Sequence, residues 1–560
     1  MTTIARHRTA MTRSLPSRPL QQAYADGLLD GDVTVFDYGC GRGDDVRSLT
    51  LAEFDASGWD PAHAPDAEKR EADIVNLGYV VNVIEDLDER IEALREAWAL
   101  TRSVLVVSAR LTWDPDSDKG KAYRDGRLTA NGTFQKYYTP EELKAWIEAT
   151  LRATAVTAAP GIYYVFRDPS AAQNLLARHS RNLTRPRQGI AELLYEQRTD
   201  LLAPVEAYVS EHRRLPPPSD LPSGPEIIDT FGSIRAAFSI IRRVTGPDQW
   251  IDIDLGTRKR SERRFEEHLD DLQPLIDFVS ERGRLPRPNE LDNEGTLREL
   301  FGSTRAAFSL IRRVTGPDRW HEFEGEARQN FLVYAALAAF GGRPAFLKLP
   351  NDLQYDAKDL FGSYKTACAK ADELLFSIAD VSSLNAACQD APFGKLTPEA
   401  LYVHANAVAQ LPPLLRVYIG AAETLTGNVD DATILKLHRQ KPQVSFLIYP
   451  TFDRDPHPPL YGSLVARLPQ LRITYKDFSQ SDNPPILHRK ETFVPDTYPG
   501  RDKFARLTRQ EERAGLLDAP NIGRQHQWQH LVAELGYQLR GHRLARKKAP
   551  REQTCHQQHK

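Results

Sequence analysis

The first 170 residues alternate short apolar runs with polar or glycine-rich turns. The clearest apolar run, at 33–36, leads through Asp37 into a turn that contains three glycines in alternate positions. A buried strand followed by such a turn is typical of an α/β sheet. Further apolar runs at 72–84, 103–108 and 153–166 predict more strands of the same sheet. The run at 103–108 is expected to be a buried parallel strand. The pattern therefore predicts an α/β domain at the start of the chain.

The glycine turn has the features of a ligand-binding site. Asp37 stands at the end of the expected strand, where open α/β sheets place their ligands. Glycines allow a sharp turn and a close approach to a ligand, because they lack a Cβ atom. The helix expected after the turn would direct N–H groups at that ligand. Asp60, about 20 positions further on, is expected at the end of the second strand, where an acid binds ribose hydroxyls. Trp59 or Pro61 would flank an adenine. A tight turn without a ligand is the alternative.

Three features of this region resemble the class I S-adenosylmethionine-dependent methyltransferases. They are the Asp37-x-Gly39-x-Gly41-x-Gly43 run, Asp60, and the segment 79–86. The resemblance covers about the first 170 residues and implies a Rossmann-like fold with S-adenosylmethionine as the cofactor. Hydride-transfer dehydrogenases share the strand–glycine–helix order, but their glycines follow G-x-G-x-x-G. The G-x-G-x-G spacing here favours the methyl donor over a nicotinamide.

Longer stretches are similar to the DNA phosphorothioation-associated methyltransferases. These stretches are Phe36-Asp-Tyr-Gly-Cys-Gly-Arg-Gly43, Gly58-Trp-Asp-Pro61, Val75-Asn-Leu-Gly-Tyr79, Thr133-Phe-Gln-Lys136, Tyr402-Val-His404 and Asn483-Pro-Pro-Ile-Leu-His-Arg-Lys-Glu491. The resemblance implies a link to bacterial defence systems that place sulfur in the DNA backbone. It makes DNA and other subunits of a phosphorothioation or restriction system the expected partners. It does not identify the methyl acceptor.

The resemblance also implies roles for individual residues. Asp37 would contact the amino-acid end of the cofactor, and Asp60 would hold its ribose. The remaining cofactor-binding positions are Gly39, Gly41, Gly43 and Tyr79. Asn76, Tyr79 and Asn82 are the candidate catalytic residues. Tyr79 and Asn82 are expected nearest to the transferred methyl group, and Asn76 with Tyr79 stands at the ends of an Asn-Pro-Pro-Tyr pattern that lacks its prolines, so this pair is a candidate to grip a base. The alternative is that Asn76 only ends a strand and Tyr79 belongs to the core. No cysteine other than Cys40, inside the turn, is placed to attack a cytosine, so C5 chemistry is not expected.

Two polar segments flank this expected core. The basic segment 6–18 is either a solvated helical lead-in that packs on the sheet, or a phosphate-contacting arm or a wall of the cofactor site. The segment 110–136 has little apolar periodicity, and so long a loop is usually functional or disordered. Its place after the fifth expected strand makes it a candidate acceptor-binding lid. A helix is expected directly after it, with Thr139 as the N-cap and Pro140 in the first position.

An internal repeat occupies the middle of the chain. The sequence from Phe231 to Pro247 recurs almost unchanged from Phe301 to Pro317, and a weaker copy begins at Phe361. Each unit is expected to hold two helices, the second capped by a serine: Ser233, Ser303 or Ser363. The units are similar to short helical repeats that bind DNA beside homing nucleases. Phosphate contacts are therefore expected from basic residues of the second helices, although a solvated spacer face is the alternative. They are Arg235, Arg242, Arg243, Arg305, Arg312 and Arg313.

After residue 390 the composition shifts towards a smaller α+β domain. A helical segment is expected at 395–425, interrupted by two prolines, with strands at 444–449 and 471–475. Asn483-Pro-Pro resembles the Asn-Pro-Pro-aromatic motif that grips a flipped base, but Ile486 replaces the aromatic residue. A second hypothesis is a metal or hydrolytic site built from Asp453, Asp455, His457, His488 and Glu491. Their spacing is not diagnostic, so packing is favoured and no metal is expected.

Four segments are thus expected. They are a methyltransferase-like domain at 1–180, a helical repeat region at 190–380, an α+β domain at 390–540, and a basic, disordered tail at 541–560. A chain of 560 residues is too long for one hydrophobic core. Its net charge of −3 confines any nucleic-acid surface to local patches.

No apolar run approaches the length of a membrane helix, and the four cysteines have no paired metal spacing. A cytoplasmic enzyme is therefore expected. The alternative function is a non-catalytic, cofactor-sensing, DNA-binding subunit of a DNA modification or restriction complex.

Overall fold

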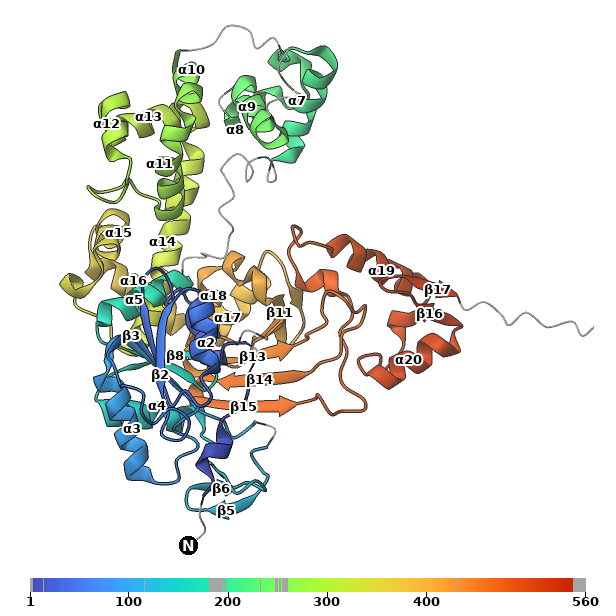
Figure 1. Cartoon of the computed structure of the whole chain (residues 1–560). Helices are drawn as coiled ribbons and strands as arrows, with labels where there is room; N and C mark the ends of the chain where they lie inside the picture. Colours follow the sequence, from blue (N-terminus) through green and yellow to red (C-terminus); the bar gives the residue numbers. More distant parts are fainter. Residues whose placement is uncertain are drawn as a thin grey trace, which may run out of the picture. The chain divides into compact units, whose positions relative to one another are not determined.

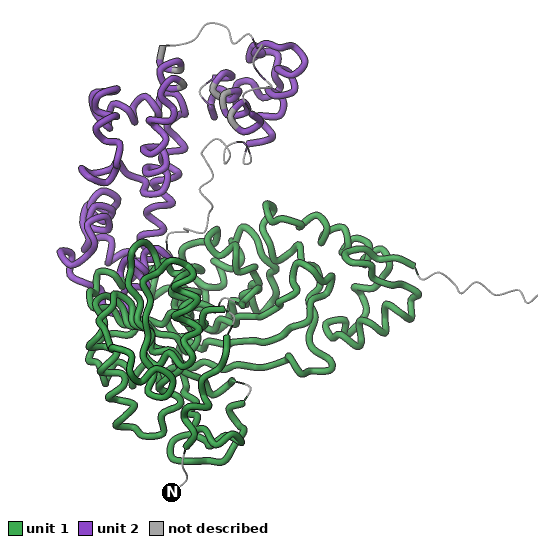
Figure 2. The backbone as a smooth tube through the Cα atoms, viewed as in Figure 1, with its two compact units in different colours: residues 1–172, 374–560 green, residues 173–373 purple. Residues whose placement is uncertain are grey.

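The computed structural model describes residues 4–546, except 14, 115, 181–194, 196, 197, 232, 247–249, 251, 252, 254–259 and 430. The chain forms two compact units (Figure 2). One comprises 1–172 and 374–560, and the other comprises 173–373. The first unit thus contains both the expected methyltransferase-like segment and the expected C-terminal domain. Of the helices in the described part, none is long and apolar enough to cross a membrane.

The amino-terminal part of the first unit is a mixed α/β fold. Its six-stranded sheet has the order β2-β1-β3-β4-β9-β8. The strands are β1 (Thr34–Tyr38), β2 (Asp55–Trp59), β3 (Ala72–Gly78), β4 (Thr101–Ser108), β8 (Ala155–Ala159) and β9 (Ile162–Phe166). Strands β2, β1, β3 and β4 run parallel, whereas β9 is antiparallel to both of its neighbours. The prediction of an α/β fold is therefore confirmed.

The helices that accompany this sheet are α1 (Arg18–Ala25), α2 (Asp44–Leu51), α3 (Leu87–Ala99), α4 (Pro140–Leu151) and α5 (Pro169–Ser180). Helices α1 to α4 pack on the sheet, as Figure 1 shows. Helices α3 and α4 share a core with buried strand residues, among them Phe36, Val75 and Leu105. The predicted start of α4 is confirmed. The Thr139 side chain accepts a hydrogen bond from the Glu142 backbone N–H at 3.2 Å, and Pro140 is the first helical residue.

The expectation of a structureless loop at 110–136 is wrong. The segment folds into a small antiparallel sheet of β5 (Lys121–Tyr123), β6 (Gly126–Leu128) and β7 (Phe134–Gln135). The buried Arg90 guanidinium on α3 binds the Asp125 carboxylate at 2.8 Å, and Lys136 binds the same carboxylate at 3.0 Å. These ion pairs attach the small sheet to the main fold, which apolar periodicity alone did not reveal.

The second sheet of this unit is entirely antiparallel. Its order is β10-β11-β12-β13-β14-β15. The strands are β10 (Lys395–Leu396), β11 (Ala400–His404), β12 (Ile434–His438), β13 (Gln443–Ile448), β14 (Gly462–Arg467) and β15 (Arg472–Asp477). The predicted helical segment 395–425 is wrong in its first part, because β10 and β11 lie there. The prolines do not interrupt a helix: Pro413 starts α18 (Pro413–Thr426), since proline fits the first helical turn.

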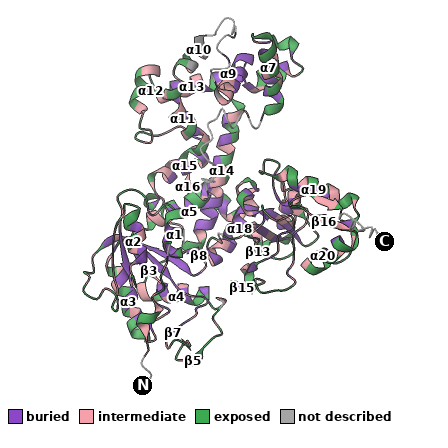
Figure 3. Cartoon of the chain, turned by 45° about the vertical axis from the view of Figure 1, so that its right-hand side comes forward, coloured by how far each residue is buried: buried purple, intermediate pink, exposed green. Residues whose placement is uncertain are grey.

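Helix α18 connects the two sheets. It packs on the antiparallel sheet through Leu415, Tyr418 and Ile419. Its carboxyl end contacts β8, where the Asn428 backbone N–H donates to the Ala158 carbonyl at 2.8 Å. Glycine is required at 427, because a Cβ atom there would lie 2.5 Å from the Ala159 backbone. Figure 3 shows that the central strands of both sheets are largely buried.

The carboxyl-terminal end of the unit is a small helical region. It contains α19 (Arg501–Arg513), α20 (Gln525–Glu534) and a hairpin of β16 (Tyr537–Leu539) and β17 (Leu544–Arg546). The predicted disorder from 541 is therefore wrong for 544–546. The rest of the predicted tail, 547–560, lies outside the described residues.

The second unit is helical. Its helices are α7 (Thr199–His212), α8 (Gly224–Phe231), α9 (Ile234–Thr245), α10 (Arg260–Glu267), α11 (Leu269–Arg282), α12 (Glu294–Phe301), α13 (Thr304–Thr315), α14 (Asp318–Ala338), α15 (Asn351–Phe361), α16 (Tyr364–Phe376) and the end of α5. A short helix, α8, α12 or α15, precedes each capping serine and was not expected. Ser303 caps α13, accepting from the Ala306 backbone N–H at 3.1 Å. The helical repeat sequences thus share one local arrangement.

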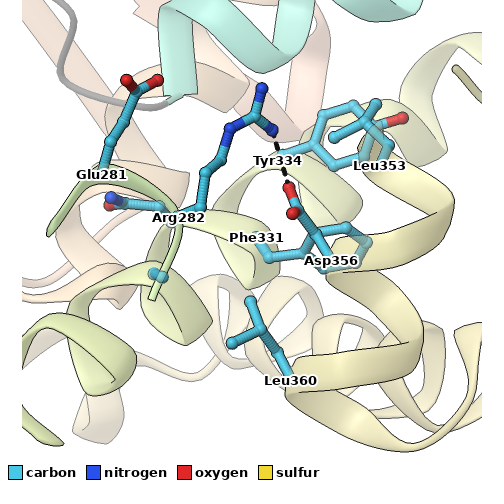
Figure 4. A pocket seen from close by; sticks show the side chains of 9 residues that line it. Glu281, Arg282, Phe331, Tyr334, Leu353, Asp356 and Leu360 are labelled. Carbon is cyan, nitrogen blue, oxygen red and sulfur yellow. Dashed lines mark hydrogen bonds and ion pairs between the residues drawn. The ribbon is translucent and has the colours of Figure 1, made fainter. Parts of the chain in front are cut away.

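Helices α11, α14 and α15 line a small pocket (Figure 4). Arg282 on α11 binds Asp356 on α15 at 3.0 Å, and apolar residues such as Phe331 on α14 and Leu360 on α15 form part of the same lining. Arg284 binds the same carboxylate and also Glu290 at 2.7 Å. Because every charged group named here has an opposite charge within contact distance, this pocket is a structural ion-pair cluster.

Candidate cofactor-binding site

The candidate site lies where the strand order of the parallel sheet reverses. After β1 the chain adds β2 on one side, and then β3 on the other side. Open α/β sheets bind ligands in the crevice at such a point, outside the carboxyl ends of the strands. Asp37 in β1 is in register with Gly58 in β2 and Asn76 in β3. The predicted cofactor residues therefore follow strand ends that meet at one edge of the sheet.

The turn after β1 needs its glycines for two different reasons. Gly39, Gly41 and Gly43 all have positive φ, at 85°, 52° and 74°. At Gly39 a Cβ atom would also lie 2.4 Å from Cγ2 of Val80, whereas at Gly43 nothing lies within 4 Å. Gly39 thus lets the loop after β3 approach the turn closely, and Gly43 serves mainly the backbone conformation.

Asp60 anchors this turn to the end of β2. Its Oδ2 accepts a hydrogen bond from the Gly41 N–H at 3.1 Å. Its Oδ1 accepts from the backbone N–H groups of Ala62 and His63, both at 2.8 Å. A carboxylate offers about four acceptor positions, so the backbone uses three and one remains for a ligand hydroxyl. The structure thus gives Asp60 a role in shaping the turn that the sequence did not suggest.

Carboxylates gather beneath the turn. Asp37 is buried, and its Oδ1 accepts a hydrogen bond from Nδ2 of Asn76 at 2.9 Å. Burial, and next the nearby Asp45 carboxylate, raise the pKa of Asp37 to about 7. Asp45 lies in the first turn of α2, where the helix dipole favours acidic side chains. The start of the expected helix could therefore have identified Asp45 from the sequence. The site is therefore rich in negative charge close to the glycine turn.

The three candidate catalytic residues differ in their surroundings. Asn76 holds Asp37 from the middle of the sheet and is 1% exposed. Asn82 is equally buried, and its backbone carbonyl accepts from the Lys136 N–H at 2.8 Å. Tyr79 follows β3 with a φ of 60°, a conformation that non-glycine residues rarely adopt. Burial raises the pKa of Tyr79, so its phenol remains protonated at neutral pH. A buried, hydrogen-bonded position favours a positioning role for Asn76.

The amino-terminal segment lies across this edge of the sheet. The Arg13 backbone N–H donates to Asp44 at 2.8 Å, and the Ser17 N–H donates to Asp45 at 2.6 Å. Ala10 packs against the turn, because a Cβ atom on Gly41 would meet its Cβ at 3.1 Å. Ala10, Arg13 and Ser17 therefore lie against the glycine turn and the start of α2.

Trp59 has only part of its ring surface available to an adenine. Its ring lies 5.3 Å from the ring of Tyr38, and the Lys69 ammonium stands 3.9 Å from its centroid. These neighbours occupy part of the indole surface.

A second group of ionisable residues lies in the carboxyl-terminal region. Of the five residues considered there, the structure brings together His457 and His488, and adds Glu511 from α19. Nothing in the sequence pattern marked Glu511. The other candidates have separate partners: Glu491 accepts from the Thr508 hydroxyl at 2.9 Å, and Asp453 accepts from the Tyr498 hydroxyl at 3.1 Å.

Asn483 does not grip a base here. Its Oδ1 accepts a hydrogen bond from the His526 N–H at 2.9 Å, at the amino end of α20. Its Nδ2 donates to Oε1 of Gln527 at 3.0 Å, and Ile486 is buried in the adjoining core. The Asn-Pro-Pro sequence therefore caps a helix, and the flipped-base hypothesis is not supported.

The expected phosphate-binding arginines are not equivalent. Arg305, Arg312 and Arg313 on α13 are exposed, whereas Arg235, at the corresponding position of α9, is 6% exposed. Arg242 is half-buried, and the side chain of Arg243 lies outside the described part. The second repeat therefore offers more accessible positive charge than the described part of the first.

Comparisons with known proteins add little to this geometry. No family model matches the chain, and no curated protein matches it. A similar solved structure is the Burkholderia thailandensis 1,6-didemethyltoxoflavin-N1-methyltransferase with bound 1,6-didemethyltoxoflavin and S-adenosylhomocysteine. It is 17% identical, covers 30% of this chain and 77% of its own, and has a TM-score of 0.18. So low a TM-score carries no argument about activity. The resemblance to the phosphorothioation-associated family stays a prediction.

Proposed function

We propose that this protein binds S-adenosylmethionine at the carboxyl ends of β1, β2 and β3 and transfers its methyl group. The observation that carries the proposal is the glycine turn surrounded by carboxylates. Asp37, Asp45 and Asp60 lie close enough for the other two to raise the pKa of Asp37. The negative charge of such a site repels the anionic pyrophosphate of a dinucleotide and attracts a ligand that carries a sulfonium and an ammonium group.

The residues present fit this cofactor. Asp60 has acceptor capacity left for one ribose hydroxyl, and Asp37 is placed to accept from the ammonium of the amino-acid end. Gly39 and Gly41 have no side chain, which lets Val80 and Ala10 close against the turn that would hold the cofactor. The cofactor itself supplies the electrophilic methyl group when bound. The chain contributes orientation and, through Ala10 and Arg13, a cover against water.

Calorimetric titration with S-adenosylmethionine tests the proposal. Asp60→Ala is expected to weaken binding about 10- to 100-fold, because it removes the ribose acceptor and the hydrogen bond to Gly41. Asp55→Ala is the matched control, since Asp55 begins the same strand but is exposed at its far end. Its affinity should equal that of the wild type. If the wild type does not bind the compound, or if both variants bind like the wild type, the proposal is wrong.

A non-catalytic sensor is the second candidate function. The burial of Asn76 and Asn82 favours it, because neither amide is accessible for contact with an acceptor. Labelled S-adenosylmethionine distinguishes the two functions. Transfer of label to DNA or protein supports the enzyme, and binding without transfer to either supports the sensor.

We also propose DNA as the partner, contacted by α13. Arg305 and Arg312 are seven residues apart and therefore share a helix face. The triple variant Arg305→Ala/Arg312→Ala/Arg313→Ala is expected to weaken DNA binding about 10-fold or more and to reduce its salt dependence by about two to three phosphate contacts. Arg298→Ala is the matched control, because Arg298 is exposed nearby but pairs with Glu294. Unchanged affinity and salt dependence in the triple variant would exclude this surface.

A further inference from the structure

Four separate segments bring His457, His488, Glu511 and Trp528 together. The Leu487 N–H donates to the Pro458 carbonyl at 3.2 Å, which places the two histidine segments side by side. The Ile486 N–H donates to the Gly523 carbonyl at 3.0 Å, which brings the start of α20 to the same place. Helix α19 contributes Glu511. The ligand atoms offered by the two histidines and Glu511 all lie within 4.8 Å of one another.

Backbone carbonyls fix the orientation and tautomer of both imidazoles. Nε2 of His488 lies 2.7 Å from the Ile522 carbonyl oxygen, and Nδ1 of His457 lies 3.2 Å from the Leu487 carbonyl oxygen. A carbonyl only accepts, so each of these nitrogens carries a proton. The other nitrogen of each ring is then directed into the cluster. Metal-binding histidines are held in this way, with the remote N–H on a carbonyl or carboxylate.

Several polar atoms of the cluster are buried without sufficient partners. Glu511 is 1% exposed, and its Oε1 lies 2.7 Å from Nε2 of His457. Its Oε2, Nδ1 of His488 and Nε1 of Trp528 have no hydrogen-bond partner among the described residues. A buried carboxylate with one partner is costly, and a cation that binds the free oxygen and the free nitrogen removes that cost.

We propose that His457, His488 and Glu511 bind one divalent transition-metal ion, with zinc as the expected metal. Two imidazole nitrogens and one carboxylate oxygen suit zinc, whereas calcium and magnesium prefer oxygen ligands alone. The ligand atoms of tetrahedral zinc lie about 3.4 Å apart. Here Nε2 of His457 and Oε1 of Glu511 are 2.7 Å apart and all the ligand atoms lie within 4.8 Å of one another, so small side-chain rotations that part the first pair and draw in His488 would give this geometry. Such a His₂Glu set leaves a fourth position for water or a substrate, which is the arrangement of catalytic rather than structural zinc.

The neighbouring side chains restrict access to this metal site. The Trp528 ring lies 4.6 Å from the His457 ring and 4.5 Å from the His488 ring, between centroids. It therefore covers the imidazoles on one side and excludes water there. This site is separate in residues and elements from the glycine turn, so it does not depend on the proposed methyl transfer.

Metal analysis of the full chain, purified without a histidine tag, tests the site. About one zinc per chain is expected after dialysis, and replacement by Co²⁺ should give visible absorption bands of four-coordinate cobalt. His488→Ala and Glu511→Gln are each expected to weaken binding about 100-fold or more, because outer partners alone account for 10- to 100-fold. His530→Ala is the matched control, since His530 lies exposed on α20 and pairs with Glu534, outside the cluster. It should keep the metal.

Two results would overturn the site: a wild-type chain that takes up neither zinc nor cobalt, or variants that retain the wild-type stoichiometry and spectrum. Circular dichroism shows whether a variant has folded. If either variant does not fold, X-ray absorption of the zinc-loaded wild type decides. A first shell of nitrogen and oxygen with two imidazoles supports the site, and a shell without two imidazoles excludes it.

Discussion

The two six-stranded sheets of this protein present their candidate sites in different ways. In the parallel sheet, Asp37, Gly39, Gly41 and Asp60 follow two strand ends and lie within 24 positions of the chain. Beyond the antiparallel sheet, His457, His488 and Glu511 come from three segments spread over 55 positions. A site built on a strand–turn–helix unit has a local sequence pattern. A site built from loops and helices that meet only in the folded chain has none.

The largest effect is expected at the parallel-sheet turn. Gly39→Ala should destabilise this part of the fold by about 3–4 kcal/mol, because it combines a left-handed backbone with a clash against Val80. Gly43→Ala should cost only about 1 kcal/mol, since nothing surrounds that position. Hydrogen exchange of β1 amides measures both. Adding Val80→Ala should restore part of the stability lost in Gly39→Ala, because it removes the clash. Equal losses of stability in Gly39→Ala and Gly43→Ala would mean that the close approach of Val80 to the turn does not matter.

The next effect concerns how the stability of the same sheet depends on pH. Burial raises the pKa of Asp37 from its usual 3.8 to about 7, so the folded state holds a proton that the unfolded state releases. The stability associated with this group is fully present below about pH 4 and is lost as the pH rises through about 7. The Asp37→Asn side chain does not ionise, so its stability does not fall in this way. Between pH 4 and pH 8 its free energy of unfolding should rise by up to about 4 kcal/mol relative to that of the wild type.

Hydrogen exchange of residues 34–38 across this pH range, corrected for intrinsic rates, measures the difference. Asp55→Asn is the control, because Asp55 is exposed and should follow the wild-type profile. A profile of Asp37→Asn that is parallel to the wild type would show that Asp37 is ionised at neutral pH.

The smallest effect is expected beside the antiparallel sheet. Asn483→Ala removes the cap from α20 and should destabilise that helix by about 1 kcal/mol, seen as faster exchange at 525–534. Asp482→Ala is the matched control, because Asp482 is exposed next to it. If both variants exchange like the wild type, the Asn483 cap does not tie the segment that carries His488 to α20. The site at His488 would then depend less on contacts between distant segments than the structure indicates.

The sequence by itself determined the local features of this protein. It predicted the parallel α/β sheet, the glycine turn after β1, and the caps at Thr139 and Ser303. These features depend on residues a few positions apart, whose spacing and side-chain chemistry are visible in the chain. The same reasoning failed at 395–404 and at the small sheet of 121–135, where tertiary contacts rather than apolar periodicity define the strands.

Only the tertiary structure decided the environment of each candidate residue. It buried Asp37 beside Asp45, engaged Asp60 with three backbone N–H groups, and placed Ala10 and Arg13 against the glycine turn and the start of α2. It also buried Arg235 while exposing Arg305 at the same position of a nearly identical repeat, and it joined Glu511 to His457 and His488. Burial and charge proximity arise from packing between distant segments, and no short sequence pattern encodes them.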